Sequence, residues 1–158
     1  MKLMDKIRYK SLLTFLSLLL VIILGSCKDE PEVQSEIMYE DTGLSDSYVI
    51  RHNSSNLLSV LIDYPEIQVE SRYSNITSQP IIEYVGQFDR IEDIPLTTER
   101  RGAPTATLKD HGGYIINLKR YDAATKDNET ILVRMLVRLR YDEAGEPSGV
   151  SMQYQIAY

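Results

Sequence analysis

Residues 131–141 read ILVRMLVRLRY, and residues 150–158 read VSMQYQIAY. In both segments apolar side chains recur at every second position, which is the period of a strand with one buried face. In the first segment, one face of the strand is apolar and consists of Ile131, Val133, Met135, Val137, Leu139 and Tyr141. The other face carries three arginines and two leucines, which are Arg134, Arg138, Arg140, Leu132 and Leu136. Residues 142–149 are rich in turn formers. We therefore predict an antiparallel hairpin.

Shorter strands precede this hairpin. The patterns predict them at residues 48–51, 57–64, 67–73, 81–87 and 113–120, separated by turn-forming residues. Residues 57–62 are apolar apart from Ser59, so periodicity alone also allows a helix there, but their β-branched content and Pro65 favour a strand. The spacing predicts an all-β fold, either an antiparallel β-sandwich or a partly open barrel.

One short helical turn is expected near residues 89–94. Asp89 precedes it and can accept hydrogen bonds from the first free amides, and Glu92 lies where a capping box places its acid. Pro95 would end the turn.

The N-terminus has the order of a secretory signal. Four basic residues precede an apolar run from Leu12 to Leu24, which is shorter than the ~20 residues of a membrane span. The run ends in Leu24-Gly25-Ser26-Cys27, which resembles a bacterial lipobox. This resemblance implies cleavage between Ser26 and Cys27 and acylation of Cys27. The alternatives are a transmembrane anchor or a soluble secreted protein.

The residues after Cys27 predict an acidic tether, 27–36, ahead of a single β-rich domain, 37–158. Lys28-Asp29-Glu30-Pro31-Glu32 is polar and contains proline, as solvated linkers do. Lys28, Asp29 and Glu30 also resemble the acidic signal that directs lipoproteins of Bacteroidetes to the cell surface. The alternative is an ordinary polar tether on a protein that faces the periplasm.

The charge balance excludes some partners. The chain carries a formal net charge of −6; four of its 17 Lys and Arg and one of its 23 Asp and Glu precede residue 27, so the remainder carries −9. Nucleic acid requires basic surfaces, so we expect no nucleic-acid partner and no membrane contact beyond the lipid on Cys27.

From residue 81 onward, the order of features resembles a small uncharacterised module of Bacteroidetes lipoproteins. The matching residues are Val85-Gly86, Ile91 with Ile94-Pro95, Gly113-Tyr114-Ile115, the strand that contains Arg138, and Gly149-Val150 with Tyr154-Gln155. The resemblance covers about half of the chain after Cys27. It implies a β-rich domain outside the cytoplasm and no assigned activity.

Catalytic patterns are sparse. Cys27 is the single cysteine and only His52 and His111 are histidines, so no zinc site of sulfur and nitrogen ligands is available and no cofactor is expected. His111 precedes two glycines and is interpreted as a turn residue. No Gly-x-Ser-x-Gly occurs. We predict that the protein is not an enzyme; a small hydrolase with paired carboxylates is the open alternative.

Two groups of side chains are candidates for binding. Arg134, Arg138 and Arg140 are able to hold an anionic polymer, although pairing with Asp or Glu across strands is the favoured interpretation. Tyr141, Tyr154 and Tyr158 are able to stack on sugars, although core packing is favoured for them.

The sequence thus predicts an outer-membrane lipoprotein, displayed at the cell surface, with a non-catalytic binding or structural role. Its partners would be the membrane and a glycan or another envelope protein; the first alternative is an accessory glycan-binding subunit of a polysaccharide-uptake system.

Overall fold

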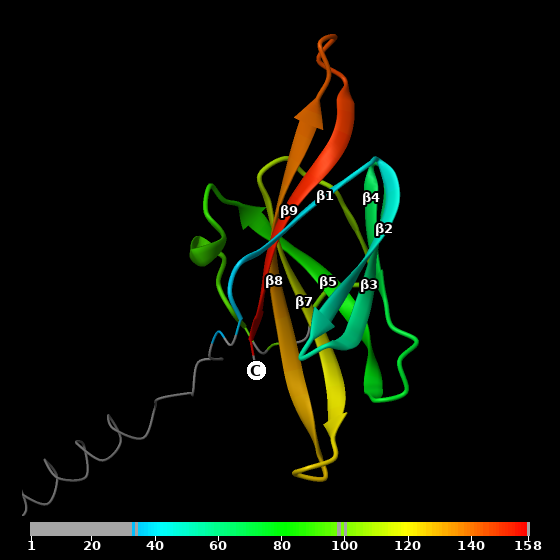
Figure 1. Cartoon of the computed structure of the whole chain (residues 1–158). Coiled ribbons are helices and arrows are strands. Elements are labelled where there is room, and N and C mark those ends of the chain that lie inside the picture. Colours follow the sequence, from blue (N-terminus) through cyan, green and yellow to red (C-terminus); the bar gives the residue numbers. More distant parts are fainter. Residues whose placement is uncertain (1–32, 34, 98, 100, 158) are drawn as a thin grey trace, which may run out of the picture. The chain divides into compact units, whose positions relative to one another are not determined.

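The computed structural model describes residues 33, 35–97, 99 and 101–157. Nine strands account for most of them (Figure 1). They are β1 (Met38–Thr42), β2 (Ser45–His52), β3 (Ser55–Asp63), β4 (Glu66–Glu70), β5 (Ile76–Gln87), β6 (Thr105–Thr107), β7 (Gly112–Asp122), β8 (Asp127–Tyr141) and β9 (Pro147–Ala157). A single 3₁₀ turn, η1 (Ile91–Asp93), lies between β5 and β6.

The strands form two antiparallel sheets. One has five strands in the order β1-β9-β8-β7-β5, and the other has four in the order β2-β3-β4-β6. The two sheets pack against each other as the layers of an open sandwich (Figure 1). The predicted all-β fold is therefore confirmed as a β-sandwich, and the long C-terminal hairpin is β8 and β9.

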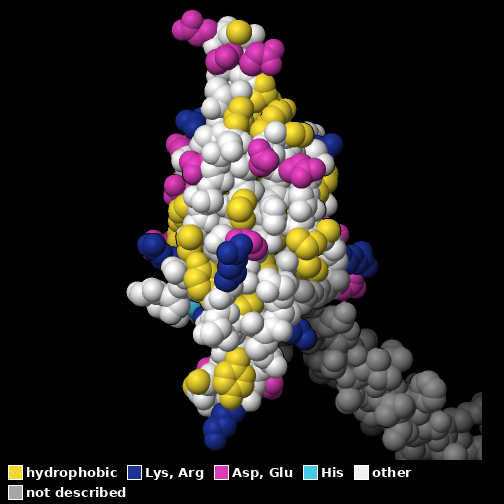
Figure 2. All heavy atoms as spheres, turned by 90° about the vertical axis from the view of Figure 1, so that its right-hand side faces the viewer, with side chains coloured by type: hydrophobic (Ala, Val, Ile, Leu, Met, Phe, Trp, Pro, Cys, Tyr) yellow, Lys and Arg dark blue, Asp and Glu magenta, His cyan; other side chains and the backbone are white. Residues whose placement is uncertain are grey.

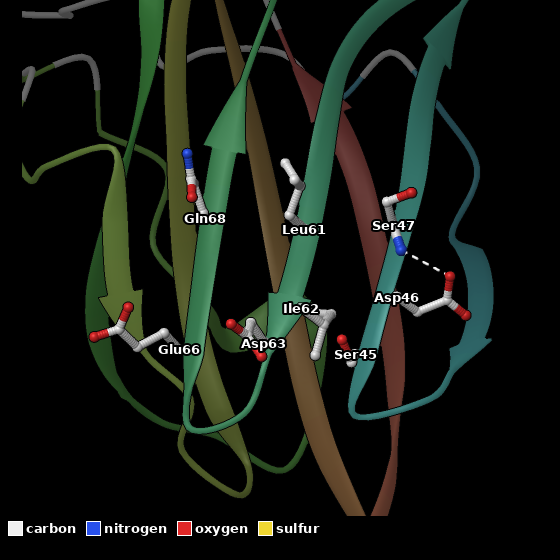
Figure 3. Close-up of a pocket in the computed structure, with 8 residues that line it drawn as sticks. All are labelled: Ser45, Asp46, Ser47, Leu61, Ile62, Asp63, Glu66 and Gln68. Carbon is white, nitrogen blue, oxygen red and sulfur yellow. Dashed lines mark hydrogen bonds between the residues drawn. The ribbon is translucent and has the colours of Figure 1, made fainter.

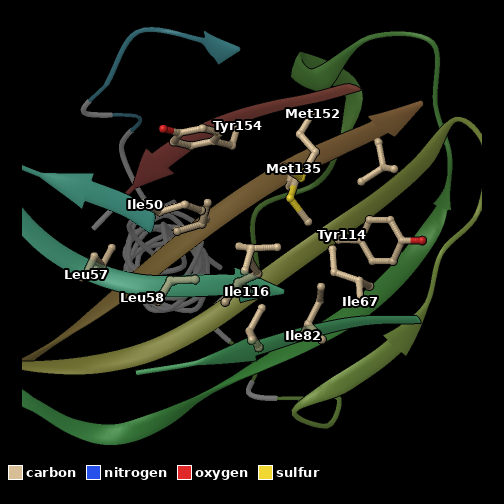
Figure 4. Packing of buried hydrophobic residues seen from close by; sticks show 14 of the residues in the cluster. Ile50, Leu57, Leu58, Ile67, Ile82, Tyr114, Ile116, Met135, Met152 and Tyr154 are labelled. Carbon is tan, nitrogen blue, oxygen red and sulfur yellow. The ribbon is translucent and has the colours of Figure 1, made fainter. Parts of the chain in front are cut away.

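The main core lies between the sheets (Figure 4). Val133, Met135 and Val137 of β8 face residues of the smaller sheet such as Val60 and Ile67, and all five are fully buried or nearly so. Tyr154 of β9 joins this core, and its hydroxyl lies 2.6 Å from the hydroxyl of Tyr48 on β2. This hydrogen bond links the two sheets within a largely apolar layer, where an unpaired hydroxyl would be costly.

A second apolar cluster covers part of the outer face of the five-stranded sheet. Residues 88–96 cross that face, and Ile91 and Ile94 pack there against Leu132 and Leu136 of β8. Gly113 makes room for the crossing, because a Cβ at that position would overlap the ring of Phe88. Residues 131–137 of β8 are consequently buried on both faces of the strand. The sequence had predicted that one of these faces would be exposed to solvent.

The predicted capping of the helical turn is wrong. The turn exists, but Arg90 occupies the N-cap position in an extended conformation with no side-chain cap. The Asp89 carboxylate instead contacts His111, and the Asp89 carbonyl accepts a hydrogen bond from Arg138. Contacts with the turn before β7 and with β8, rather than local capping, hold this segment.

The largest differences between the predicted and the observed strands are at three places. β1 and β6 were not predicted, because β1 reads MYEDT with little apolar character and β6 has only three residues. β5 begins at Ile76, ahead of Pro80, where the sequence suggested a turn. Register shifts flank Pro80 and β5 is an edge strand, which is where a sheet accommodates proline.

Candidate functional site

The three predicted binding arginines occupy different environments along β8. Arg134 is only 9% exposed and lies beneath residues 88–96, whereas Arg138 and Arg140 lie at the surface nearer the end of the strand. They therefore do not form one basic strip.

Arg134 is a structural residue. Its Nε donates to Oε1 of Gln155 at 2.8 Å, and its Nη1 donates to the carbonyl oxygens of Glu92 at 3.2 Å and Ile94 at 3.5 Å. Burial lowers the pKa of Arg134, and the carboxylate of Glu92 acts in the opposite direction. The guanidinium thus fixes the crossing segment to the sheet through neutral acceptors.

Arg138 and Arg140 also donate to backbone carbonyls. Nη2 of Arg138 lies 2.7 Å from the carbonyl oxygen of Asp89, and Nη2 of Arg140 lies 2.9 Å from that of Thr42. Gly149 permits the second contact, because a Cβ there would overlap the Arg140 guanidinium. The favoured prediction of cross-strand pairing with Asp or Glu is wrong for these arginines, since the ion pairs found among the described residues involve other side chains. Each guanidinium has five N–H donors, so most remain for other partners.

Both surface arginines line an open groove on the outer face of the five-stranded sheet. We call it the β8 groove; its volume is about 670 Å³. Its lining comes from β1, β8 and β9 and consists of Tyr39, Glu40, Asp41, Leu136, Arg138, Leu139, Arg140, Ser151, Met152 and Gln153.

The β8 groove offers one aromatic ring and a mixture of polar groups. Tyr39 is 68% exposed. It pairs with Gln153 in the register of β1 and β9, and Asp41 pairs with Ser151, whose hydroxyl donates to the Asp41 carboxylate. Donors, acceptors and an apolar ring therefore lie on one surface, which is the composition that orients polar ligands.

Tyr39 and Asp41 were not predicted as site residues. They belong to β1, and only its pairing with β9 brings them beside Arg138. Of the predicted tyrosines, Tyr154 is a core residue, as the favoured interpretation stated, and Tyr141 is 51% exposed. Tyr158 lies outside the described residues.

A smaller pocket of about 400 Å³ adjoins Arg138 and contains Asp89, Asp110 and His111. His111 Nδ1 lies 3.2 Å from Oδ1 of Asp89. The Asp110 carboxylate accepts the backbone N–H of His111 at 3.0 Å and of Leu139 at 2.9 Å, so it ties the loop to β8. His111 has a φ of 55°, which confirms its interpretation as a turn residue.

A third hollow, of about 510 Å³, lies on the outer face of the four-stranded sheet (Figure 3). Its lining includes Leu61 of β3 and three acids, Asp46, Asp63 and Glu66. Figure 2 views this side of the domain, where hydrophobic side chains are scattered among charged ones rather than gathered. Across the described part of the chain, no group of three or more His, Cys, Asp or Glu is placed to hold a metal ion.

The predicted membrane-targeting residues lie outside the described residues. These are the signal peptide 1–26 with Ser26, the acylation site Cys27, and the export signal Lys28, Asp29 and Glu30. Within the described ranges, no helix has the length and hydropathy needed to cross a bilayer.

Comparisons with known proteins gave no family for this chain. No family model matches it, and neither a curated protein nor a solved structure does so. The resemblance to a Bacteroidetes lipoprotein module therefore stays a prediction from the sequence.

Proposed function

We propose that this chain is a lipid-anchored lipoprotein of the outer membrane whose β-sandwich binds a ligand at the cell surface without catalysing a reaction. The membrane anchor is the acylated Cys27, and the ligand site is the β8 groove. The observation that supports binding is the convergence of Tyr39 and Asp41 from β1 with Arg138 from β8 onto one open surface.

The anchor rests on the sequence around Cys27. The Leu24-Gly25-Ser26-Cys27 motif follows a basic and then an apolar segment, and no second cysteine competes for the acyl chains. Several acyl chains on one residue anchor a protein stably, whereas a single chain holds it only marginally.

The binding proposal rests on the charges of the β8 groove. The lining contains two arginines, Arg138 and Arg140, and two acids, Glu40 and Asp41, so its formal charge is zero. A groove of this kind suits a neutral or mixed-charge ligand with many hydroxyl groups, because each polar group of the lining finds a partner.

A glycan is the ligand class that this chemistry favours, which supports the alternative of a glycan-binding subunit in a polysaccharide-uptake system. Tyr39 exposes most of its ring beside the groove, and aromatic faces stack on the apolar faces of sugars. Guanidinium, carboxylate, amide and hydroxyl groups then provide hydrogen bonds to the sugar hydroxyls.

A glycan array tests the proposal. We expect the wild type to bind neutral or mixed-charge glycans at low and high salt alike, because exposed charges beyond ~8 Å are screened at physiological ionic strength and the groove has no net charge to screen. Tyr39→Ala and Arg138→Ala should each remove binding, and Tyr121→Ala, an exposed tyrosine on β7, is the matched control.

Two results would contradict it. Equal loss in the Tyr121→Ala control would show that the β8 groove is not the site. Absence of binding to every glycan class by the folded wild type would remove the glycan proposal.

A further inference from the structure

The β7–β8 hairpin projects beyond the point where the N-terminal segment joins the fold. Ala157 is the last residue of β9 and pairs with Leu132 of β8, while β8 begins five residues earlier, at Asp127. At ~3.3 Å per residue the hairpin therefore extends about 16 Å past Ala157. Its tip is the loop between Asp122 and Asp127.

The N-terminal segment is fixed to the same end of the domain. Val33 forms an antiparallel bridge with Ala157, and the Ser35 hydroxyl accepts the backbone N–H of Ile156 at 2.8 Å. Val33 therefore joins the sheet at the end where β9 finishes. β9 is antiparallel to β8, so this is also the end from which the hairpin projects.

The fully extended tether and the projecting hairpin have similar lengths. Six peptide units separate Cys27 from Val33, and a fully extended chain spans at most ~3.6 Å per residue, so the acylated cysteine lies within about 22 Å of the sheet. The hairpin covers about 16 Å of the same interval. For a domain anchored through Cys27, a hairpin of this length is therefore able to reach the lipid surface.

The tip carries side chains that suit a membrane interface. Tyr121 is 45% exposed, and Ala123, Ala124 and Lys126 are exposed around it. Tyrosine has a polar end and an apolar ring, and lysine extends its ammonium group to the head groups, so both residues are favoured at bilayer interfaces.

The acids of the hairpin are already bonded within it. The Asp122 carboxylate accepts the backbone N–H of Ala124 and the hydroxyl of Thr125, both at 2.9 Å. Glu129 forms an ion pair with Arg120. Lys126 is the one cation of this loop, and it lies between Asp122 and Asp127, whose carboxylate accepts the backbone N–H of Asn128 at 2.7 Å.

Charge differs between the two ends of the domain. Figure 2 shows Asp and Glu side chains gathered at the upper end, where the β8–β9 hairpin lies, and a basic side chain at the lowest point. Asp142, Glu143 and Glu146 belong to the upper hairpin. Because the lower tip balances Lys126 against Asp122 and Asp127, an anionic lipid surface repels the upper end more strongly than the lower one.

We infer that the tip of the β7–β8 hairpin rests on the lipid surface that holds the acylated Cys27, as a second contact beside the lipid anchor. This inference deepens the proposed function and rests on its lipid anchor. It also places the β8 groove away from the membrane, because Arg138 lies eleven residues along β8 from Asp127, or about 36 Å at ~3.3 Å per residue.

A fluorescence experiment tests the contact independently of acylation in cells. Pro31–Tyr158 forms one compact unit, so the chain that begins at Cys27 keeps the whole fold. Its single cysteine is coupled to a maleimide lipid in phosphatidylcholine vesicles that contain brominated lipid. The chain has no tryptophan, so Tyr121→Trp supplies the only indole, and Tyr141→Trp at the other end of the domain is the matched control.

We expect brominated lipid to reduce the emission of the Tyr121→Trp variant and to leave that of the Tyr141→Trp variant unchanged. Ten Gly and Ser residues inserted between Glu32 and Val33 should restore much of the lost emission, because the longer tether frees the domain from the surface. Equal quenching of both variants, or quenching of neither, would overturn the inference. The coupling is chemical, so such a failure leaves the proposed acylation of Cys27 in cells unaffected.

Discussion

Nε of Arg134 lies 2.8 Å from Oε1 of Gln155, and both side chains are at most 9% exposed. This contact joins β8 to β9 on the face that residues 88–96 cover. The same guanidinium reaches the carbonyls of Glu92 and Ile94, so one cation satisfies three acceptors and connects the sheet to the segment above it.

Arg134→Met should destabilise the domain by about 2 to 4 kcal/mol, because it leaves buried acceptors unpaired at about 1 to 3 kcal/mol each. Adding Gln155→Leu removes one of those acceptors and should recover part of the loss, since apolar replacement of a buried polar pair is often tolerated. Urea unfolding of the two variants measures this. A loss below about 0.5 kcal/mol in the single variant would show that Arg134 does not hold the segment.

Neighbouring positions near the end of β8 should differ sharply in tolerance. Val137 is fully buried in the main core, and Arg138 is exposed. Val137→Asp places an unpaired charge in that core and should cost several kcal/mol, a large part of a domain's ~5 to 15 kcal/mol. Arg138→Ser should cost less than about 1 kcal/mol. Equal losses in thermal or urea unfolding would contradict this register.

The β8–β9 hairpin was predictable because its pattern is local. A strand with one face in a core repeats every two residues, and Ile131, Val133, Met135 and Val137 follow that rule. The burial of Arg134 was not predictable in this way. It depends on a segment about 40 residues away in sequence, which covers the other face.

The β8 groove was predictable only in part. Arg138 and Arg140 were candidates because basic residues repeat along one strand. Tyr39 and Asp41 lie about 100 residues earlier and join them through the pairing of β1 with β9. The acidic sequence of β1 hides its strand character, as is common for edge strands.

Stability should fall at high pH. The Tyr114 hydroxyl donates to the carbonyl of Thr107 and accepts the N–H of Lys109, both at 2.8 Å, and burial raises the pKa of Tyr114 to about 12. An unfolded tyrosine has a pKa of about 10, so above that pH the unfolded chain binds fewer protons than the folded one. The stabilisation is complete below pH ~10 and is lost as pH rises toward 12, by about 2 to 3 kcal/mol.

Urea unfolding at several alkaline pH values measures this loss. The Tyr114→Phe variant should show a shallower fall, although not a flat profile, because the pKa of the buried Tyr154 is raised as well. Tyr39→Phe, at an exposed position, is the matched control. An unchanged slope in the Tyr114→Phe variant would show that another group causes the alkaline loss.

Display at the cell surface depends on the proposed export signal. Protease added to intact cells should degrade the wild type, and the double variant Asp29→Ala with Glu30→Ala should be protected until the cells are lysed. Glu36→Ala, further along the same acidic stretch, is the control and should remain accessible. A wild type that is protected in intact cells and degraded in lysed cells would place the domain in the periplasm.

The most direct test of the proposed function is incorporation of labelled palmitate. The wild type should be labelled, and Cys27→Ala should abolish labelling and leave an unprocessed or soluble chain, because Cys27 is the only thiol. Ser26→Ala keeps a small residue before the cleavage site and should still be labelled. Persistent labelling of Cys27→Ala, or an unlabelled wild type, would contradict the lipid anchor on which the account depends.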